Sequence, residues 1–220
     1  MTYINEQIDL RRIDPDLLDQ LLADGWRHFG TRFLRYSMTI LGDRICRVVP
    51  LRIRLSDFDP TRSQRRTEAR NRDLTLHIRP SVIDQEQERL FDRHKRRFRH
   101  NVPDSILDFL SPAPDTVPCR NDQLCLRKDG LLLATSFLDV GQRSASAVYA
   151  MFEPEESACS LGIQLILSGI DYAKRLNLQY YYLGYACQEP SFYDYKKRFS
   201  ALEAFDWMGN WSSYHDREEI

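Results

Sequence analysis

The sequence lacks the cysteine spacing of a disulfide framework or of a zinc knuckle. Its five cysteines are odd in number, and no two of them form a Cys-x-x-Cys pair. This spacing argues against a secreted scaffold held by disulfides and against a structural zinc site. We therefore expect reduced thiols with mostly structural roles, no metal site and no bound cofactor.

Long apolar runs are missing too. No stretch approaches the roughly 18 consecutive apolar residues of a transmembrane helix, and the first residues lack the basic and apolar regions of a secretion signal. We therefore expect a cytoplasmic protein without membrane association. The 220 residues are 42% hydrophobic and 29% charged, which is ordinary for a globular protein large enough to bury a substantial core.

The chain also lacks an excess of charge of one sign, since its formal net charge is −1. This balance conceals a basic zone between residues 60 and 100, where twelve Lys or Arg accompany six Asp or Glu. The zone therefore carries +6, which leaves −7 for the rest of the chain. A basic zone within a nearly neutral protein favours a polyanionic partner.

Hydrophobic periodicity predicts a mixture of helices and strands. Residues 51–55 alternate as a half-buried strand does, Asp129-Gly130 predicts a hairpin turn, and the four prolines of residues 103–118 indicate a loop. Helices are expected over residues 14–24, 63–71, 84–99 and 161–176, and strands over 31–41, 48–55, 74–78, 124–128, 131–139, 146–152 and 179–183. The basic helices 63–71 and 84–99 are expected to lie side by side.

Four regions carry the most distinctive residue patterns. They are GWRHFG from Gly25 to Gly30, FDPTRSQRR from Phe58 to Arg66, AVYAMFEP from Ala147 to Pro154 followed by SLG at 160–162, and YYYLGY from Tyr180 to Tyr185 followed by YKKRF at 195–199. The last of these regions is typical of the wall of a binding site. It combines a tyrosine-rich strand, a glycine that permits close approach and a following segment of basic and aromatic residues.

In order and spacing, these regions resemble the aminoacyl-tRNA protein transferases, over roughly residues 15–211. That family comprises arginyl and bacterial leucyl enzymes that attach an amino acid to proteins beginning with Asp or Glu. The resemblance implies charged tRNA as co-substrate and an acidic protein, peptide or small molecule as acceptor.

The resemblance also implies the fold class. The expected structure is α+β and acetyltransferase-like (GNAT-type), with a mixed sheet, helices on both of its faces and an added N-terminal α/β part. Three strands, a helix and a further strand after residue 120 follow the order expected of that fold. We expect an N-terminal basic part over residues 1–102 and a transferase core over 103–220, joined in one compact unit.

The implied reaction is the attack of an amine on the ester that links an amino acid to the terminal adenosine of tRNA. It requires alignment of the reactants, removal of a proton from the ammonium group and donors for the developing oxyanion. No covalent nucleophile is needed. Asp139 is the candidate proton acceptor, and Tyr149 and Tyr185 are the candidate donors. Alternatively, Asp139 caps a turn and the tyrosines are packing residues.

Tyr195, Lys196 and Arg198 are the candidate acceptor-binding residues. In an extended segment Lys196 and Arg198 point to the same face, where both can pair with the carboxylate of an acidic acceptor. The alternative interpretation is a solvated, charged strand edge. The sequence leaves open whether leucine or arginine is the donor amino acid.

Two groups of residues are candidates for binding tRNA. The first group comprises Arg62, Gln64, Arg65 and Arg66, because arginines three and four apart share a helix face that can follow a phosphate backbone. The alternative for this group is an ion-pair network with Asp59 and Glu68. The second group is Ser160 and Gly162 at the start of a helix, where free N–H groups attract phosphate. The alternative for Ser160 is a simple helix cap.

The sequence also departs from the family pattern. The N-terminal cysteine motif is absent and only Cys46 remains before Pro50, which argues against the iron-sulfur or zinc chemistry associated with those cysteines. His28-Phe29 stands where the family has Arg-Ser, and the loop 186–193 also differs from the family pattern. The sequence therefore leaves open whether the acceptor differs from that of the family. The alternative functions are an acyl-CoA N-acyltransferase on the same core and a degenerate homologue that only binds tRNA.

Overall fold

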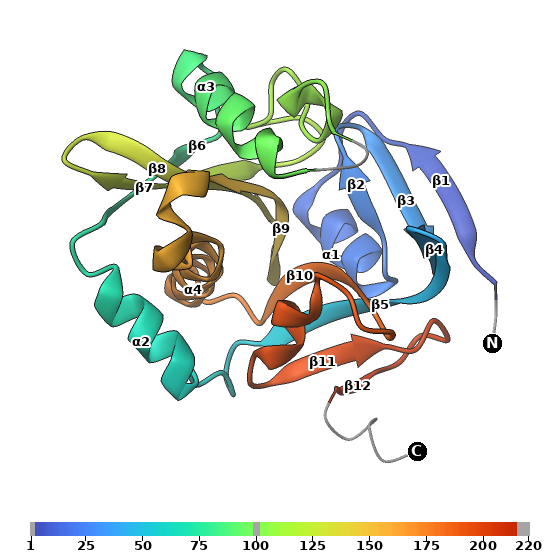
Figure 1. Cartoon of the computed structure of the whole chain (residues 1–220). Helices are drawn as coiled ribbons and strands as arrows, with labels where there is room; N and C mark the ends of the chain where they lie inside the picture. The colour runs from blue at the N-terminus through green and yellow to red at the C-terminus, as the bar shows by residue number, and fades with distance from the viewer. Residues whose placement is uncertain (1–2, 99–101, 215–220) are drawn as a thin grey trace.

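The computed structural model describes residues 3–98 and 102–214, and a mixed sheet runs through its centre (Figure 1). Its described strands follow the order β12-β11-β5-β10-β9-β8-β7-β6, and β4 pairs with β5. The strands are β4 (Met38–Leu41), β5 (Arg44–Arg54), β6 (Thr75–Pro80), β7 (Asn121–Lys128), β8 (Leu131–Val140), β9 (Ser144–Phe152), β10 (Tyr180–Cys187), β11 (Leu202–Phe205) and β12 (Trp211–Ser213). Because strands from both sides of residue 102 share this sheet, the two expected parts are built into one structure.

A smaller sheet lies on one face of the first. It consists of β1 (Asn5–Asp9), β3 (Arg32–Tyr36) and β2 (Arg27–Phe29), paired in that order. Helix α1 (Pro15–Ala23) precedes β2, and the Asp14 side chain accepts a hydrogen bond from the N–H of Leu17 at 2.8 Å. This confirms the helix expected over 14–24, which an aspartate caps and a proline begins. We call α1 and β1–β3 the N-terminal module.

The helices α3 (Gln85–His94) and α4 (Leu161–Arg175) cover opposite faces of the main sheet. Neighbouring strand residues show this, since Leu124 is buried in the core with Leu167 of α4, whereas Cys125 is buried with Leu90 of α3. Successive residues of a strand point to opposite faces. Helices on both faces are therefore confirmed.

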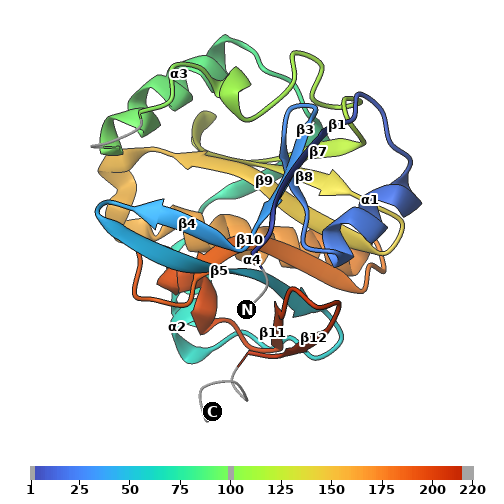
Figure 2. The same ribbon diagram turned by 90° about the vertical axis from the view of Figure 1, so that its right-hand side faces the viewer.

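Helix α2 (Arg62–Arg70) packs against α4, and α3 lies at the other end of the molecule (Figures 1 and 2). The expectation that the two basic helices lie side by side is wrong. The physical reason is that the sheet and α4 lie between them, since each helix buries its own stripe against a different layer.

Most other elements occur where periodicity predicted them, with shifted ends. The hairpin between β7 and β8 turns at Asp129 and Gly130, both at positive φ, as a two-residue hairpin turn requires. The predicted helix 84–99 ends at His94, a 3-10 turn follows over Lys95–Arg97, and Arg99 lies outside the described residues. Among the described helices, none is both long and apolar enough to cross a membrane.

Candidate functional site

The site is built where the parallel strands β9 and β10 separate. Their pairing joins Ser144 to Tyr180 and ends at Ser146 and Tyr182, although both strands continue further. Figure 1 shows the two strands diverging from that point. Beyond the last pair, β9 and β10 are no longer paired with one another, and an unpaired strand edge is a place where an extended segment can bind.

Gly184 stands on β10 just beyond the point of separation. Its φ is +89°, and β10 has a bulge between Tyr182 and Gly184 against β5. A Cβ atom at this position would lie 3.2 Å from the Lys196 Nζ, so the glycine leaves room for that group. The ammonium group also donates to the Tyr185 carbonyl at 2.9 Å.

Burial and the nearby Arg27 lower the pKa of Lys196 to about 7, while Cys187 opposes the shift. The Tyr193 ring lies 4.9 Å from the same Nζ. A lysine with a pKa near neutrality is in part an uncharged amine, which is the form that accepts a proton. Lys196 was expected from the sequence as an acceptor-binding residue, and its surroundings also suit it for proton transfer.

We predict that Lys196→Met removes one component of the pH dependence of stability. Between about pH 7 and the ordinary lysine pKa of about 10.4, the unfolded chain binds more protons than the folded one, so the contribution of Lys196 to stability rises with pH. Urea unfolding at pH 7 and pH 9.5 should show a smaller rise for Lys196→Met than for the wild type. Lys197→Met is the control, because Lys197 forms an ion pair with Asp194 at 2.7 Å. An unchanged rise in Lys196→Met would contradict the assignment.

Arg27 enters the same region from β2 of the N-terminal module. Its Nη1 donates to the Ser146 Oγ at 2.7 Å, and its guanidinium carbon lies 5.4 Å from the Tyr182 ring and 5.8 Å from the Tyr185 ring. Burial lowers the pKa of Arg27, against the opposing effects of Tyr185, Tyr182 and Asp139. Ser146, the last paired residue of β9, is therefore hydrogen-bonded to the buried cation Arg27.

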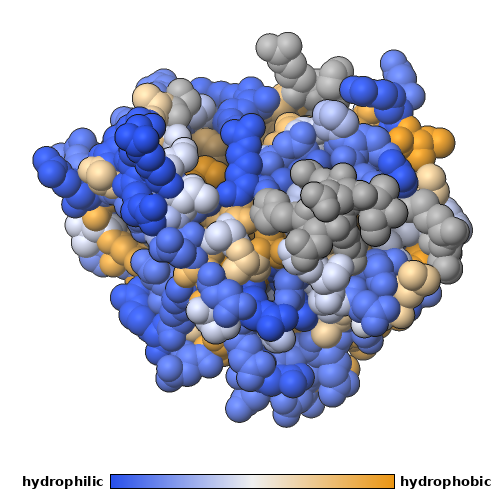
Figure 3. Space-filling model, turned by 90° about the horizontal axis from the view of Figure 1, so that it is seen from below, coloured by the Kyte–Doolittle hydropathy of each residue, from blue (hydrophilic) through white to orange (hydrophobic). Residues whose placement is uncertain are grey.

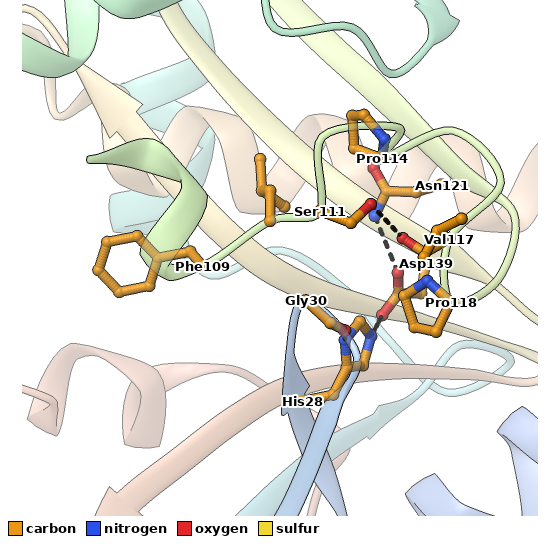
Figure 4. A pocket seen from close by; sticks show the side chains of 10 residues that line it. His28, Gly30, Phe109, Ser111, Pro114, Val117, Pro118, Asn121 and Asp139 are labelled. Atoms are coloured by element: carbon orange, nitrogen blue, oxygen red, sulfur yellow. Dashed lines mark hydrogen bonds and ion pairs between the residues drawn. The ribbon is translucent and has the colours of Figure 1, made fainter. Parts of the chain in front are cut away.

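Asp139 lies near Arg27, at the end of β8, and both of its carboxylate oxygens have hydrogen-bond partners (Figure 4). One carboxylate oxygen is 2.7 Å from the His28 Nε2, and the other accepts from the Asn121 amide at 2.8 Å. Burial lowers the pKa of His28, but Asp139 and the Gly30 carbonyl outweigh it and raise the pKa overall. With both oxygens bonded, Asp139 is placed to tie the N-terminal module to the sheet. A role as proton acceptor stays a prediction.

His28, Asp139 and Cys119 are residues of the kind that bind metals, and their ligand atoms lie within 4.8 Å of one another. A cavity of about 10 Å³ next to His28 and Asp139 has room for about one water molecule. The His28 Nδ1 is 2.8 Å from the Gly30 carbonyl oxygen, and Cys119 is hydrogen-bonded to Asp139. The set could hold a metal ion, but these protein contacts already satisfy its polar atoms.

The two candidate tyrosines differ in their surroundings. Tyr149 on β9 stacks on Phe109 with ring centroids 4.1 Å apart, and its buried hydroxyl has no partner among the described residues. Burial raises its pKa, so the group remains a neutral donor. Tyr185 instead donates to the carbonyls of Gly25 at 2.6 Å and Leu34 at 3.3 Å, which links β10 to the N-terminal module.

We therefore predict that Tyr185→Phe loosens the N-terminal module, at a cost of about 1 kcal/mol for the lost hydrogen bond. Hydrogen exchange followed by mass spectrometry should show faster exchange in β2 and β3 and little change in α4. Tyr195→Phe is the control, because Tyr195 is 39% exposed and lies on the 3-10 helix outside the N-terminal module. Equal exchange in Tyr185→Phe and the wild type would contradict this role.

The segment that carries the acceptor candidates is not extended. Residues Asp194–Arg198 form a 3-10 helix, begun by a turn in which the Asp194 carboxylate accepts from the N–H of Ser191. Lys196 points toward Tyr185, whereas Arg198 is exposed. The expected shared face of Lys196 and Arg198 is therefore wrong, and Tyr195 and Arg198 lie at the surface outside the buried group.

The first group of tRNA candidates lies on α2. Arg62, Arg65 and Arg66 are exposed, whereas Gln64 is buried and completes a capping box with Thr61. Arg65 also lies 3.5 Å from Asp59, so part of the alternative ion-pair network is present. Seen from below, the side of the molecule that carries α2 is largely hydrophilic (Figure 3).

The second group lies where β9 leads into α4. Ser160 is in the left-handed region at φ +53°, and its side chain makes no capping bond to α4. Ser160 therefore stands at the N-cap position of α4, as the alternative interpretation expected, but without a side-chain capping bond. Gly162 packs against Phe152, whose ring would lie 3.2 Å from a Cβ atom placed there. This packing explains the glycine, whether or not phosphate binds nearby.

Both basic helices end at this β9–α4 connection, from opposite faces of the sheet. The Arg70 Nη1 of α2 donates to the Ala158 carbonyl. On the other face, Arg93 of α3 pairs with Glu153 at 2.6 Å, and Arg97 lies 4.3 Å from the Phe152 ring. Sequence reasoning missed this convergence.

Sequence reasoning also assigned no role to Arg27, His28 and Ser146. The first two belong to GWRHFG, which is bounded by glycines at positive φ, and this was the available signal. Their partners come from β8 and β9, which no local pattern could indicate.

Solved structures support the fold. FemX has a TM-score of 0.52 at 13% identity and covers 88% of this chain and 68% of its own. The C-terminal domain of a protein described as a lysylphosphatidylglycerol synthetase from Agrobacterium fabrum has a TM-score of 0.50 at 20% identity, covering 80% and 54%. The expected acetyltransferase-like class is confirmed.

Sequence comparisons identify the family. Residues 84–206 match the model described as "Arginine-tRNA-protein transferase, C terminus". An aspartate/glutamate leucyltransferase of Xanthomonas campestris pv. campestris strain B100 is 33% identical, covering 73% of this chain and 68% of that protein. Those of Hahella chejuensis and Xylella fastidiosa strain M23 are 31% and 34% identical, covering 89% and 85% of this chain and 84% and 75% of their own. This chain therefore belongs to the arginine-tRNA-protein transferase family of aminoacyltransferases.

Proposed function

We propose that this protein transfers leucine or arginine from charged tRNA to the α-amino group of a protein or peptide that begins with Asp or Glu, in the cytoplasm. The observation that carries the proposal is the separation of β9 and β10, with the buried Arg27 and the half-buried Lys196 at its origin. Positive charge at this place suits an acidic acceptor. The names of the three leucyltransferase relatives support the same acceptor class.

The chemistry needs no covalent intermediate. Neutral Lys196 takes a proton from the acceptor's ammonium group, and the resulting amine attacks the ester carbonyl. The bond between that carbonyl and the ribose oxygen of tRNA then breaks, and the proton passes from Lys196 to the leaving oxygen. Neutral Lys196 takes the second proton from the new amide nitrogen and releases it to solvent. Holding the amine and the ester together supplies much of the acceleration, and the unpartnered Tyr149 hydroxyl is the candidate donor to the oxyanion.

The charged tRNA is proposed to approach along the β9–α4 connection. Arginines of α2 and the end of α3 flank this connection from both faces of the sheet, and positive charge on both sides suits the phosphates of an acceptor stem. The terminal aminoacyl-adenosine would then reach Lys196 along β9.

Single-turnover transfer from labelled leucyl-tRNA and arginyl-tRNA to an Asp-initiated peptide tests the proposal. We expect one of the two to give labelled peptide and the other to give little, which also identifies the donor. Transfer from neither, with the charged tRNAs shown to be intact, would contradict the proposal. Transfer of acetyl from acetyl-CoA to the same peptide would favour the acyltransferase alternative.

A further inference from the structure

Arg27 presents an unused hydrogen-bonding edge inside the protein. Only 9% of the residue is exposed. Its Nη1 is bonded to Ser146, but its Nε and Nη2 are buried and have no partner in the part of the chain that the structure describes. Nε and Nη2 form one edge of the planar guanidinium group, with two parallel N–H bonds. Buried donors normally have a partner, so this edge requires explanation.

A second buried arginine, among the residues that the structure describes, shows what the fold does elsewhere. Arg52 is 8% exposed, and its Nε donates to the Glu203 carboxylate at 2.7 Å. Arg27 has two tyrosine rings in place of a carboxylate. Asp139 acts on it only through its charge, because both of its oxygens are bonded to His28 and Asn121.

The charges around Arg27 do not balance. Lys196 is a second basic group close enough to interact electrostatically with Arg27, and Asp139 already pairs with His28. An anion that approached from the place where β9 and β10 separate would meet Lys196 and then the free edge of Arg27. Lys196 belongs to a short 3-10 helix in which Tyr195 and Arg198 are exposed, and binding of an anion at Arg27 requires its side chain to turn away from the Tyr185 carbonyl.

We propose that Arg27 binds the side-chain carboxylate of the acceptor's N-terminal Asp or Glu through its Nε–Nη2 edge. A guanidinium edge and a carboxylate form two parallel hydrogen bonds, and this pairing is specific for planar anions. An amide in place of the carboxylate brings no charge and turns its NH₂ group toward an N–H donor. Arg27 thus distinguishes Asp and Glu from Asn and Gln. This inference rests on the proposed function.

Transfer kinetics with two matched peptides, one beginning with Glu and one with Gln, test the inference. Arg27→Met should lower kcat/KM for the Glu peptide by about 30-fold or more, the loss expected for one partner of a buried charged pair, and mainly by raising KM. The value for the Gln peptide should change by less than about threefold. Arg27→Lys, which keeps the charge without the two-pronged edge, should fall between the two. Equal losses with both peptides, or no loss with either, would overturn the inference.

Thermal unfolding without tRNA separates this inference from the proposed function. The Glu peptide should raise the Tm of the wild type but not of Arg27→Met, and the Gln peptide should raise neither. A shift in the wild type without any transfer would refute the proposed function and leave carboxylate binding standing. Equal shifts with both peptides, or no shift in the wild type, would overturn carboxylate binding by Arg27.

The stability of the unliganded variants gives an independent readout. Arg27→Met removes a buried charge without a carboxylate partner, so its Tm should equal or exceed that of the wild type. Arg52→Met is the matched control, since it breaks a buried pair with Glu203, and its Tm should fall while the preference for Glu over Gln persists. A fall for Arg27→Met as large as that for Arg52→Met would show that Arg27 is structural.

Discussion

Replacing Asp139 by Ala is expected to destabilise the protein by about 3–5 kcal/mol, the usual cost of removing one partner of a buried ion pair. The variant leaves His28 without its carboxylate 2.7 Å away and the Asn121 amide without its acceptor. The pKa of His28 is raised in the folded protein, so its pairing stabilises the fold below about pH 6.5 and this contribution is lost as pH rises through the folded pKa. The deficit should therefore be larger at pH 6 than at pH 8.5.

Urea unfolding of Asp139→Ala at these two pH values measures the effect. Asp171→Ala removes an exposed aspartate of α4 and should change stability by no more than about 0.5 kcal/mol. If Asp139 is instead the proton acceptor of the reaction, the outcome differs: Asp139→Ala would keep wild-type stability and lose transfer through kcat. The experiment thus decides between the two roles that the sequence left open for this residue.

Replacing Arg62, Arg65 and Arg66 together by Ala is expected to weaken the binding of charged tRNA and to reduce its dependence on salt. The three side chains are exposed on α2. Each phosphate contact contributes about one unit to the slope of log affinity against log salt, so the slope should fall by about three. Fluorescence anisotropy with labelled tRNA at several salt concentrations measures it.

The control for this prediction removes the same charge elsewhere. Arg11, Arg12 and Arg32 are also exposed, but they belong to the N-terminal module and its flank. Their replacement by Ala should leave most of the slope in place. Equal reductions in the two triple variants would show that tRNA binding follows total charge and not the position of α2.

Local features of the fold could be predicted because their causes are local. Asp14 and Pro15 begin α1, and Asp129-Gly130 turns the hairpin. The placement of α2 and α3 could not be predicted in this way. Gln64 and Thr67 turn a buried polar stripe of α2 toward α4, whereas α3 buries Leu90 and Phe91 under the opposite face. Positive charge alone therefore says nothing about which helices are neighbours.

Only the local features of the candidate site could be predicted from the sequence. The motif that contains Lys196 indicated a basic, aromatic wall, but the turn at Ser191 winds the segment into a 3-10 helix and separates Lys196 from Arg198. Arg27 could not be recognised as a site residue because its partner Ser146 is far away in the sequence and adjacent only in the fold. An unpaired guanidinium edge is a property of packing, which no spacing of residues reveals.

The most direct test of the central claim is a competition within one reaction. Equal concentrations of two peptides that differ only in a first residue of Glu or Gln are incubated with the protein and the charged tRNA that serves as donor, and the products are counted by mass spectrometry. We expect the amino acid to be added predominantly to the Glu peptide and Arg27→Met to abolish this preference. Equal labelling of both peptides by the wild-type protein would contradict it.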